Sequence, residues 1–111
     1  NPKIARQLEA KKAAIDSGEG IDWATGEALA FGTLLLEGHR VRLSGEDVQR
    51  GTFSHRHAVL VDQRNQAEYV PLNNIRAGQK RFEAFSSLLS EFGVLGVEYG
   101  YSIADPHTLT L

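Results

Sequence analysis

The chain has 111 residues, a formal net charge of −2 and a hydrophobic share of 41%, which suits one small domain with a modest core. Its basic residues are scattered, which argues against a nucleic-acid or membrane-surface binder, and its apolar stretches are too short to span a bilayer. It contains no cysteine, so disulfides, thiolate metal sites and cysteine nucleophiles are excluded.

The first twenty residues form a short polar helix in our interpretation. Asn1-Pro2 predicts a helix start, because asparagine caps a helix and proline is tolerated at the first helical position. A glycine-containing polar stretch at residues 16–20 ends the helix. We interpret residues 1–20 as a helical linker and residues 21–111 as a domain. Because the chain starts on Asn1 and ends on an apolar run, we expect that domain to be an incomplete part of a larger protein.

A second helix and a first strand follow. Asp22 predicts the start of a helix that runs to about Leu36. Residues 41–43 predict a strand, and a flexible polar corner with Glu46 comes directly after it. In open α/β sheets, ligands bind at the carboxyl ends of the strands. Glu46 is therefore placed where a site is expected.

The second half of the chain predicts a parallel sheet with a small hairpin. Residues 57–63 and 68–72 pair as a hairpin over a polar turn. Residues 81–86 and 108–111 are strands, separated by a helix over Ser86 to Tyr101. Strand, helix and strand at this spacing form a βαβ unit, which indicates an α/β fold with a parallel sheet.

The helix predicted over residues 86–101 is apolar on nearly every side and is expected to be buried. Gly93, Gly96 and Gly100 form a stripe along it. Each costs roughly 1 kcal/mol in a helix interior, so we expect another backbone, domain or ligand to approach closely. Glu91 lies in the first turn, where a buried, unpaired carboxylate would be expensive. The helix pattern alone favours an incidental charge at a helix N-terminus.

Two groupings of residues were considered as sites. His55 and His57 would share one face of an extended backbone and could hold a metal only with a third ligand from elsewhere, so surface or hydrogen-bonded histidines are the favoured interpretation. Glu46 and Glu91 both follow strands that end at the same sheet edge, which predicts an acidic site there. No motif for a nucleotide loop or a serine nucleophile is present, and the residues alone name no reaction.

Two stretches carry a family resemblance. Residues 21–60, IDWATGEALAFGTLLLEGHRVRLSGEDVQRGTFSHRHAVL, and residues 89–102, LSEFGVLGVEYGYS, resemble the decarboxylating first component of 2-oxoglutarate dehydrogenase complexes. The resemblance implies part of a transketolase-like pyrimidine-binding domain. Its expected fold is a doubly wound, mainly parallel sheet with flanking helices, here with a small hairpin insertion.

The resemblance also implies a cofactor and two site residues. The family uses thiamine diphosphate and Mg²⁺, and the metal is bound by a part of the enzyme outside this chain. Glu91 matches the catalytic glutamate that hydrogen-bonds the pyrimidine ring nitrogen of the cofactor. Glu46 matches an acidic cofactor-site position that belongs to a proton relay in related enzymes. A solvated turn carboxylate is the alternative interpretation of Glu46.

The implied partners are a second copy of the chain, contacted through the glycine-rich helix, the dihydrolipoyl succinyltransferase component, and 2-oxoglutarate. The implied location is the cytoplasm of a bacterium or the mitochondrial matrix. Alone, the chain is expected to be inactive. The alternatives are a related thiamine-dependent 2-oxoglutarate decarboxylase or carboligase, a non-catalytic α/β binding module, and a metalloenzyme built on His55 and His57.

Overall fold

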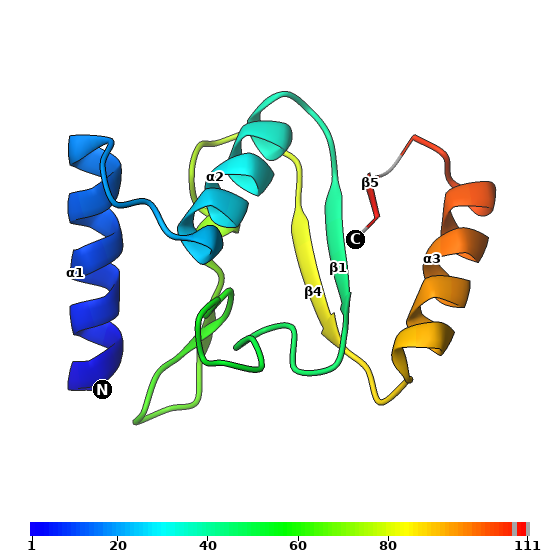
Figure 1. The fold of residues 1–111 in the computed structure, drawn as a ribbon. Coiled ribbons are helices and arrows are strands. Elements are labelled where there is room, and N and C mark those ends of the chain that lie inside the picture. Colours follow the sequence, from blue (N-terminus) through cyan, green and yellow to red (C-terminus); the bar gives the residue numbers. More distant parts are fainter. Residues whose placement is uncertain (108, 111) are drawn as a thin grey trace.

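The fold is an α/β arrangement around a three-stranded parallel sheet. The computed structural model describes residues 1–107 and 109–110. The sheet has the order β4-β1-β5, with β1 at Val41–Gly45, β4 at Phe82–Ser86 and β5 at Leu109–Thr110, all parallel. Helices α2 (Trp23–Leu36) and α3 (Glu91–Ala104) lie on opposite sides of it (Figure 1). The predicted α/β class with a parallel sheet is confirmed.

The core lies between α2 and one face of the sheet. Side chains alternate along β1, so Val41 and Leu43 are buried on the α2 side while the residues between them point to the other face. On the α2 side, the rings of Phe31 and Phe82 stack with centroids 5.8 Å apart. Leu35, at 0% exposure, fills the centre of this cluster.

The first two helices begin where their capping residues predict. Asn1 caps α1 (Pro2–Ser17), which ends at Gly18 in the left-handed region with φ 74°. Helix α1 contributes no buried residue. The Asp22 carboxylate accepts a 2.8 Å hydrogen bond from the Thr25 amide. Hydrogen bonds from Thr25 hold the pKa of Asp22 below its usual range. The division into a linker over 1–20 and a domain over 21–111 stays a prediction.

The hairpin is present but shorter than predicted. Strands β2 (Leu60–Val61) and β3 (Glu68–Tyr69) pair in antiparallel register. His57 has a left-handed backbone with φ 47°, which an extended strand cannot contain. Pro71 starts the 3-10 turn η1 (Pro71–Asn73) and ends the second arm.

Helix α3 differs most from its prediction. It starts at Glu91 rather than Ser86, because Ser86 still pairs with Gly45 in the sheet and Ser90 caps the helix. Leu88, which lies within the helix predicted over residues 86–101, precedes the observed helix and is 99% exposed. The expected burial is wrong for this chain: α3 contributes no buried residue. One side of α3 faces the sheet, and within the described part of the chain large apolar residues on its other sides remain exposed, with Phe92 at 87%.

The last predicted strand is seen in part. Leu109–Thr110 pairs with β1, whereas residues 108 and 111 lie outside the described residues. Of the helices in residues 1–107 and 109–110, none has the length and apolar character needed to cross a membrane.

Replacing Leu35 by alanine is expected to lower the free energy of unfolding by about 2–5 kcal/mol, because it leaves a cavity at the centre of the core. The matched control is Leu29→Ala on the exposed side of the same helix, expected to cost about 0.5 kcal/mol or less. Urea unfolding measures both changes. Equal losses would contradict this description of the core.

Candidate functional site

Glu46 and Glu91 lie together at one edge of the sheet. Glu46 follows Gly45, the last residue of β1, and Glu91 begins α3 just after β4. The connection stays close to β1 because the Ser87 amide donates a 2.7 Å hydrogen bond to the Gly45 carbonyl. A hollow of about 330 Å³ is lined by Gly45, Glu46, Leu89, Glu91, Val94 and Leu95. The predicted meeting of the two carboxylates is therefore confirmed, whereas their chemical roles stay a prediction.

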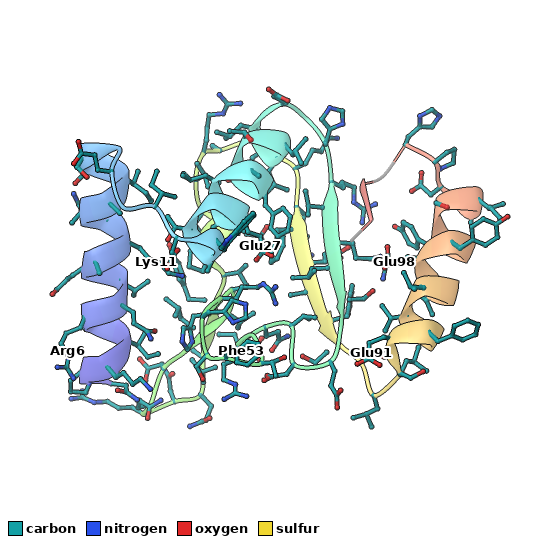
Figure 2. All side chains as sticks on the ribbon, in the orientation of Figure 1. Arg6, Lys11, Glu27, Phe53, Glu91 and Glu98 are labelled. Atoms are coloured by element: carbon teal, nitrogen blue, oxygen red, sulfur yellow. The ribbon has the colours of Figure 1, made fainter. Side chains whose placement is uncertain are left out.

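Glu91 occupies the first turn of α3, where its charge is favoured by the helix dipole. The helix is fixed at this end by Ser90, whose hydroxyl accepts a 3.3 Å hydrogen bond from the Gly93 amide. Glu91 is exposed, yet it shares the hollow with three aliphatic side chains. Figure 2 shows it at the end of α3 nearest the β4–α3 connection. Such a carboxylate can hydrogen-bond a flat nitrogen heterocycle while the aliphatic groups contact the ring.

The loop that carries Glu46 is shaped by three contacts. Val48 enters the core directly after the turn. Gly51 has φ 81°, and a Cβ there would lie 2.5 Å from the ring of His55, so this position requires glycine. Arg50 pairs with Asp47 and holds the pKa of the Asp47 carboxyl below its usual range.

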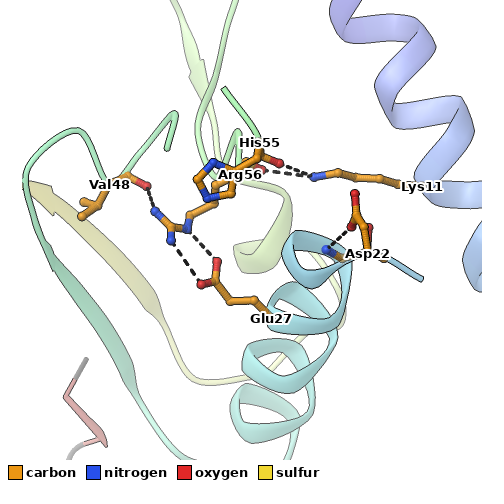
Figure 3. A network of polar contacts seen from close by, with 7 residues as sticks. Lys11, Asp22, Glu27, Val48, His55 and Arg56 are labelled. Carbon is orange, nitrogen blue, oxygen red and sulfur yellow. Dashed lines mark hydrogen bonds and ion pairs between the residues drawn. The ribbon is translucent and has the colours of Figure 1, made fainter. Parts of the chain in front are cut away.

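Arg56 fastens this loop to α2 (Figure 3). Its guanidinium donates from Nε to Glu27 Oε1 at 2.6 Å, from Nη2 to Glu27 Oε2 at 3.1 Å and from Nη1 to the Val48 carbonyl at 2.9 Å. Lys11 reaches across from α1 and donates to the His55 carbonyl at 3.0 Å. This role of Arg56 could not be predicted from the sequence, because no spacing rule links an arginine in a loop to a glutamate 29 residues earlier.

His55 and His57 make different contacts in the loop. His57 has a left-handed backbone, and its Nε2 lies 2.9 Å from the Ser54 carbonyl oxygen. His55 instead lies against Gly51 and Phe53. In the part of the chain that the structure describes, no three histidine, aspartate or glutamate side chains gather as metal ligands. The interpretation of His57 as a hydrogen-bonded loop histidine is confirmed.

A second polar group lies between β1 and α3 and was also missed. Glu98 Oε1 accepts hydrogen bonds from Arg42 Nη2 at 2.9 Å and from Ser44 Oγ at 2.7 Å. The Arg42 guanidinium carbon lies 4.1 Å from the centre of the Tyr101 ring. Two signals pointed to it: the β1 alternation places Arg42 and Ser44 on one face, and Glu98 follows Glu91 by two helical turns.

A parallel sheet with flanking helices and an acidic hollow at its strand ends defines a class of α/β protein. Sequence comparison identifies this class. The profile of the transketolase pyrimidine-binding domain matches residues 19–111, and the chain belongs to this family.

Within that class, the chain is 59% identical over 108 residues to the 2-oxoglutarate dehydrogenase E1 components of Brucella ovis and Brucella canis, and 58% identical to that of Brucella melitensis. The alignments cover 97% of this chain and 11% of each relative. The chain thus spans about one ninth of the length of these relatives.

Replacing Arg56 by lysine is expected to free the loop over residues 46–59, because lysine cannot make the forked contact with Glu27. We expect the free energy of unfolding to fall by about 2 kcal/mol, which is typical of hydrogen bonds to charged groups. We also expect faster hydrogen exchange of the loop amides. Arg64→Lys, in the exposed hairpin turn, is the control and should leave both quantities unchanged. Unaltered exchange in Arg56→Lys would contradict the fastening role.

Proposed function

We propose that this chain supplies the surface that binds the aminopyrimidine of thiamine diphosphate in a 2-oxoglutarate dehydrogenase. The observation that carries the proposal is the hollow in which Glu46 and Glu91 meet at the carboxyl edge of the sheet. Membership of the pyrimidine-binding family and the similarity to 2-oxoglutarate dehydrogenase E1 components support it.

The residues of the hollow fit this group. Leu89, Val94 and Leu95 give it an apolar lining suited to the faces of a flat ring, and its carboxylates are the polar groups able to orient a ring nitrogen. Both carboxylates are exposed, so each is accessible to a ligand. When bound, thiamine diphosphate supplies the electron sink for cleavage of the carbon–carbon bond of a 2-oxoacid.

The contribution of this chain is orientation and proton control. Glu91 would share its carboxyl proton with the pyrimidine ring nitrogen and would hold the ring in one orientation. Glu46, which also lines the hollow, would belong to a proton relay toward a second site. The aliphatic lining excludes water from the face of the ring, which strengthens the hydrogen bond to Glu91.

The whole protein carries out the remaining steps. It decarboxylates 2-oxoglutarate and passes the succinyl group to the lipoyl arm of the dihydrolipoyl succinyltransferase component. Mg²⁺ and the diphosphate are held by a part of the enzyme outside this chain, so the chain alone is inactive. The protein works in the bacterial cytoplasm or, in a eukaryote, in the mitochondrial matrix.

A homodimer through α3 belongs to the same proposal. Gly96 and Gly100 have nothing within 4 Å of an added Cβ in the part of the chain described, so contacts among the described residues do not explain these glycines. Phe92, Leu95 and Tyr99 are exposed on the same helix. A second copy packed here would cover these side chains and use the glycines for close approach.

Replacing Glu91 by alanine in the full-length protein is expected to lower kcat for 2-oxoglutarate decarboxylation by about 10²–10⁴-fold, the contribution of a positioned acid or base. Release of carbon dioxide from the carboxyl-labelled substrate measures it, and succinyl transfer to a lipoyl acceptor is followed in parallel. Glu68→Ala, in the exposed hairpin, is the control. Undiminished decarboxylation in Glu91→Ala would exclude the proposed role.

Replacing Gly96 by leucine should leave α3 intact, because the added side chain has open space within the described chain and leucine is the better helix former. In the full-length protein it should weaken dimerisation and, with it, cofactor affinity. Sedimentation velocity measures the first and calorimetry the second. Gly26→Leu on α2, where an added Cβ also meets open space, is the control. A Gly96→Leu dimer of normal stability would refute this interface.

A further inference from the structure

We propose that Arg42 and Glu98 are positioning residues that fix the rotation of α3 on the sheet and thereby aim Glu91 into the acidic hollow. The inference rests on the proposed function of Glu91 and adds residues that do not themselves line the hollow.

The contact between β1 and α3 is made by a compact polar group. Arg42 and Ser44 extend from the central strand, and both donate to the same oxygen of Glu98, at 2.9 and 2.7 Å. The ion pair is largely enclosed, with side-chain exposures of 12% for Arg42 and 15% for Glu98. Tyr101, one turn further along α3, stacks on the Arg42 guanidinium at 4.1 Å. The side chains of Arg42, Ser44, Glu98 and Tyr101 thus form one connected set of contacts.

The helical period connects this group to Glu91. Seven residues separate Glu91 from Glu98, which is two turns, or about 10 Å along the helix axis, on nearly the same face. Val94 and Tyr101 are also seven positions apart and lie on this face, where both are half-buried. Figure 2 shows Glu91 and Glu98 on the side of α3 that faces the sheet. Any rotation of α3 that breaks the Glu98 contacts would also swing Glu91 away from Glu46.

Little else in the described chain determines that rotation. Helix α3 has no buried residue, and Phe92, Leu95 and Tyr99 are exposed rather than inserted into a core. An apolar contact is also tolerant of small rotations, whereas two hydrogen bonds to one carboxylate oxygen are directional. The polar group therefore supplies a constraint that the hydrophobic contacts lack.

The energetics favour a geometric role over a purely stabilising one. Arg42 Nε and Glu98 Oε2 are buried and have no hydrogen-bond partner among the described residues. An enclosed ion pair with unfilled donors and acceptors gains little net stability, and apolar replacements are often as stable. The presence of these two charges, despite the free-energy cost of burying them, is consistent with a role in specifying one arrangement of α3 on the sheet.

The test compares variants of the full-length protein by their dissociation constant for thiamine diphosphate, measured by calorimetry, and by kcat. Arg42→Leu combined with Glu98→Leu removes both charges together, so no unpaired charge stays buried. We expect a melting temperature close to the unmodified value, with cofactor affinity and kcat lowered roughly ten- to hundredfold, as for small misplacements of a catalytic group. Ser44→Ala, the gentler variant, should lower affinity severalfold.

The control is Arg40→Gln, which removes a more exposed ion pair with Glu83 on the same sheet and should change neither quantity. The positioning role is overturned if Ser44→Ala and the folded double variant bind the cofactor with unmodified affinity and kcat. If the double variant fails to fold, Ser44→Ala decides alone. If Glu91→Ala loses activity while Ser44→Ala and the folded double variant are both normal, only the positioning role is refuted, whereas a fully active Glu91→Ala would refute the proposed function.

Discussion

The parallel pairing of β1 with β4 is the constraint on which the rest of the structure depends. Five residue pairs, from Val41 with Phe82 to Gly45 with Ser86, bring two segments about forty residues apart into one register. Because both strands end at the same level, the turn after β1 and the start of α3 face each other. A shift of one strand by one residue relative to the other would turn the side chains of that strand to the opposite face. The pairing register of β1 and β4 therefore determines both the composition of the core and the position of the acidic hollow.

The central strand serves two different chemistries on its two faces. Toward α2 it presents Val41 and Leu43 to a packed apolar core. The free energy of folding gained there comes from the burial of apolar surface, which is a non-directional effect. Toward α3 it presents Arg42 and Ser44 to Glu98, where the interaction is directional. The side that holds the apolar core and the side that contacts α3 are thus built from alternate residues of one strand.

Local signals in the sequence predicted much of the fold. The structure confirms the predicted caps at Asn1 and Asp22, the βαβ order, and the location of Glu46 and Glu91 at one edge of the sheet. Each of these predictions depends on short-range rules or on the position of the ends of parallel strands. The start of α3 was misplaced, since serines suit both a strand end and a helix cap. The ion pairs of Arg56 and Arg42 were missed, because periodicity places a side chain on a face of its own element but does not identify its partner on a distant one. The exposure of α3 could not be foreseen from a pattern that only measures apolar content.

The exposed apolar side of α3 has a consequence for how the protein is made. Phe92, Leu95, Tyr99 and Ile103 present bulky apolar groups to water on a helix that contributes no buried residue. During translation this surface is open to other chains, and such surfaces promote association between incomplete chains. Unwanted association would therefore begin at α3, which gives chaperones that shield apolar segments a defined place to act.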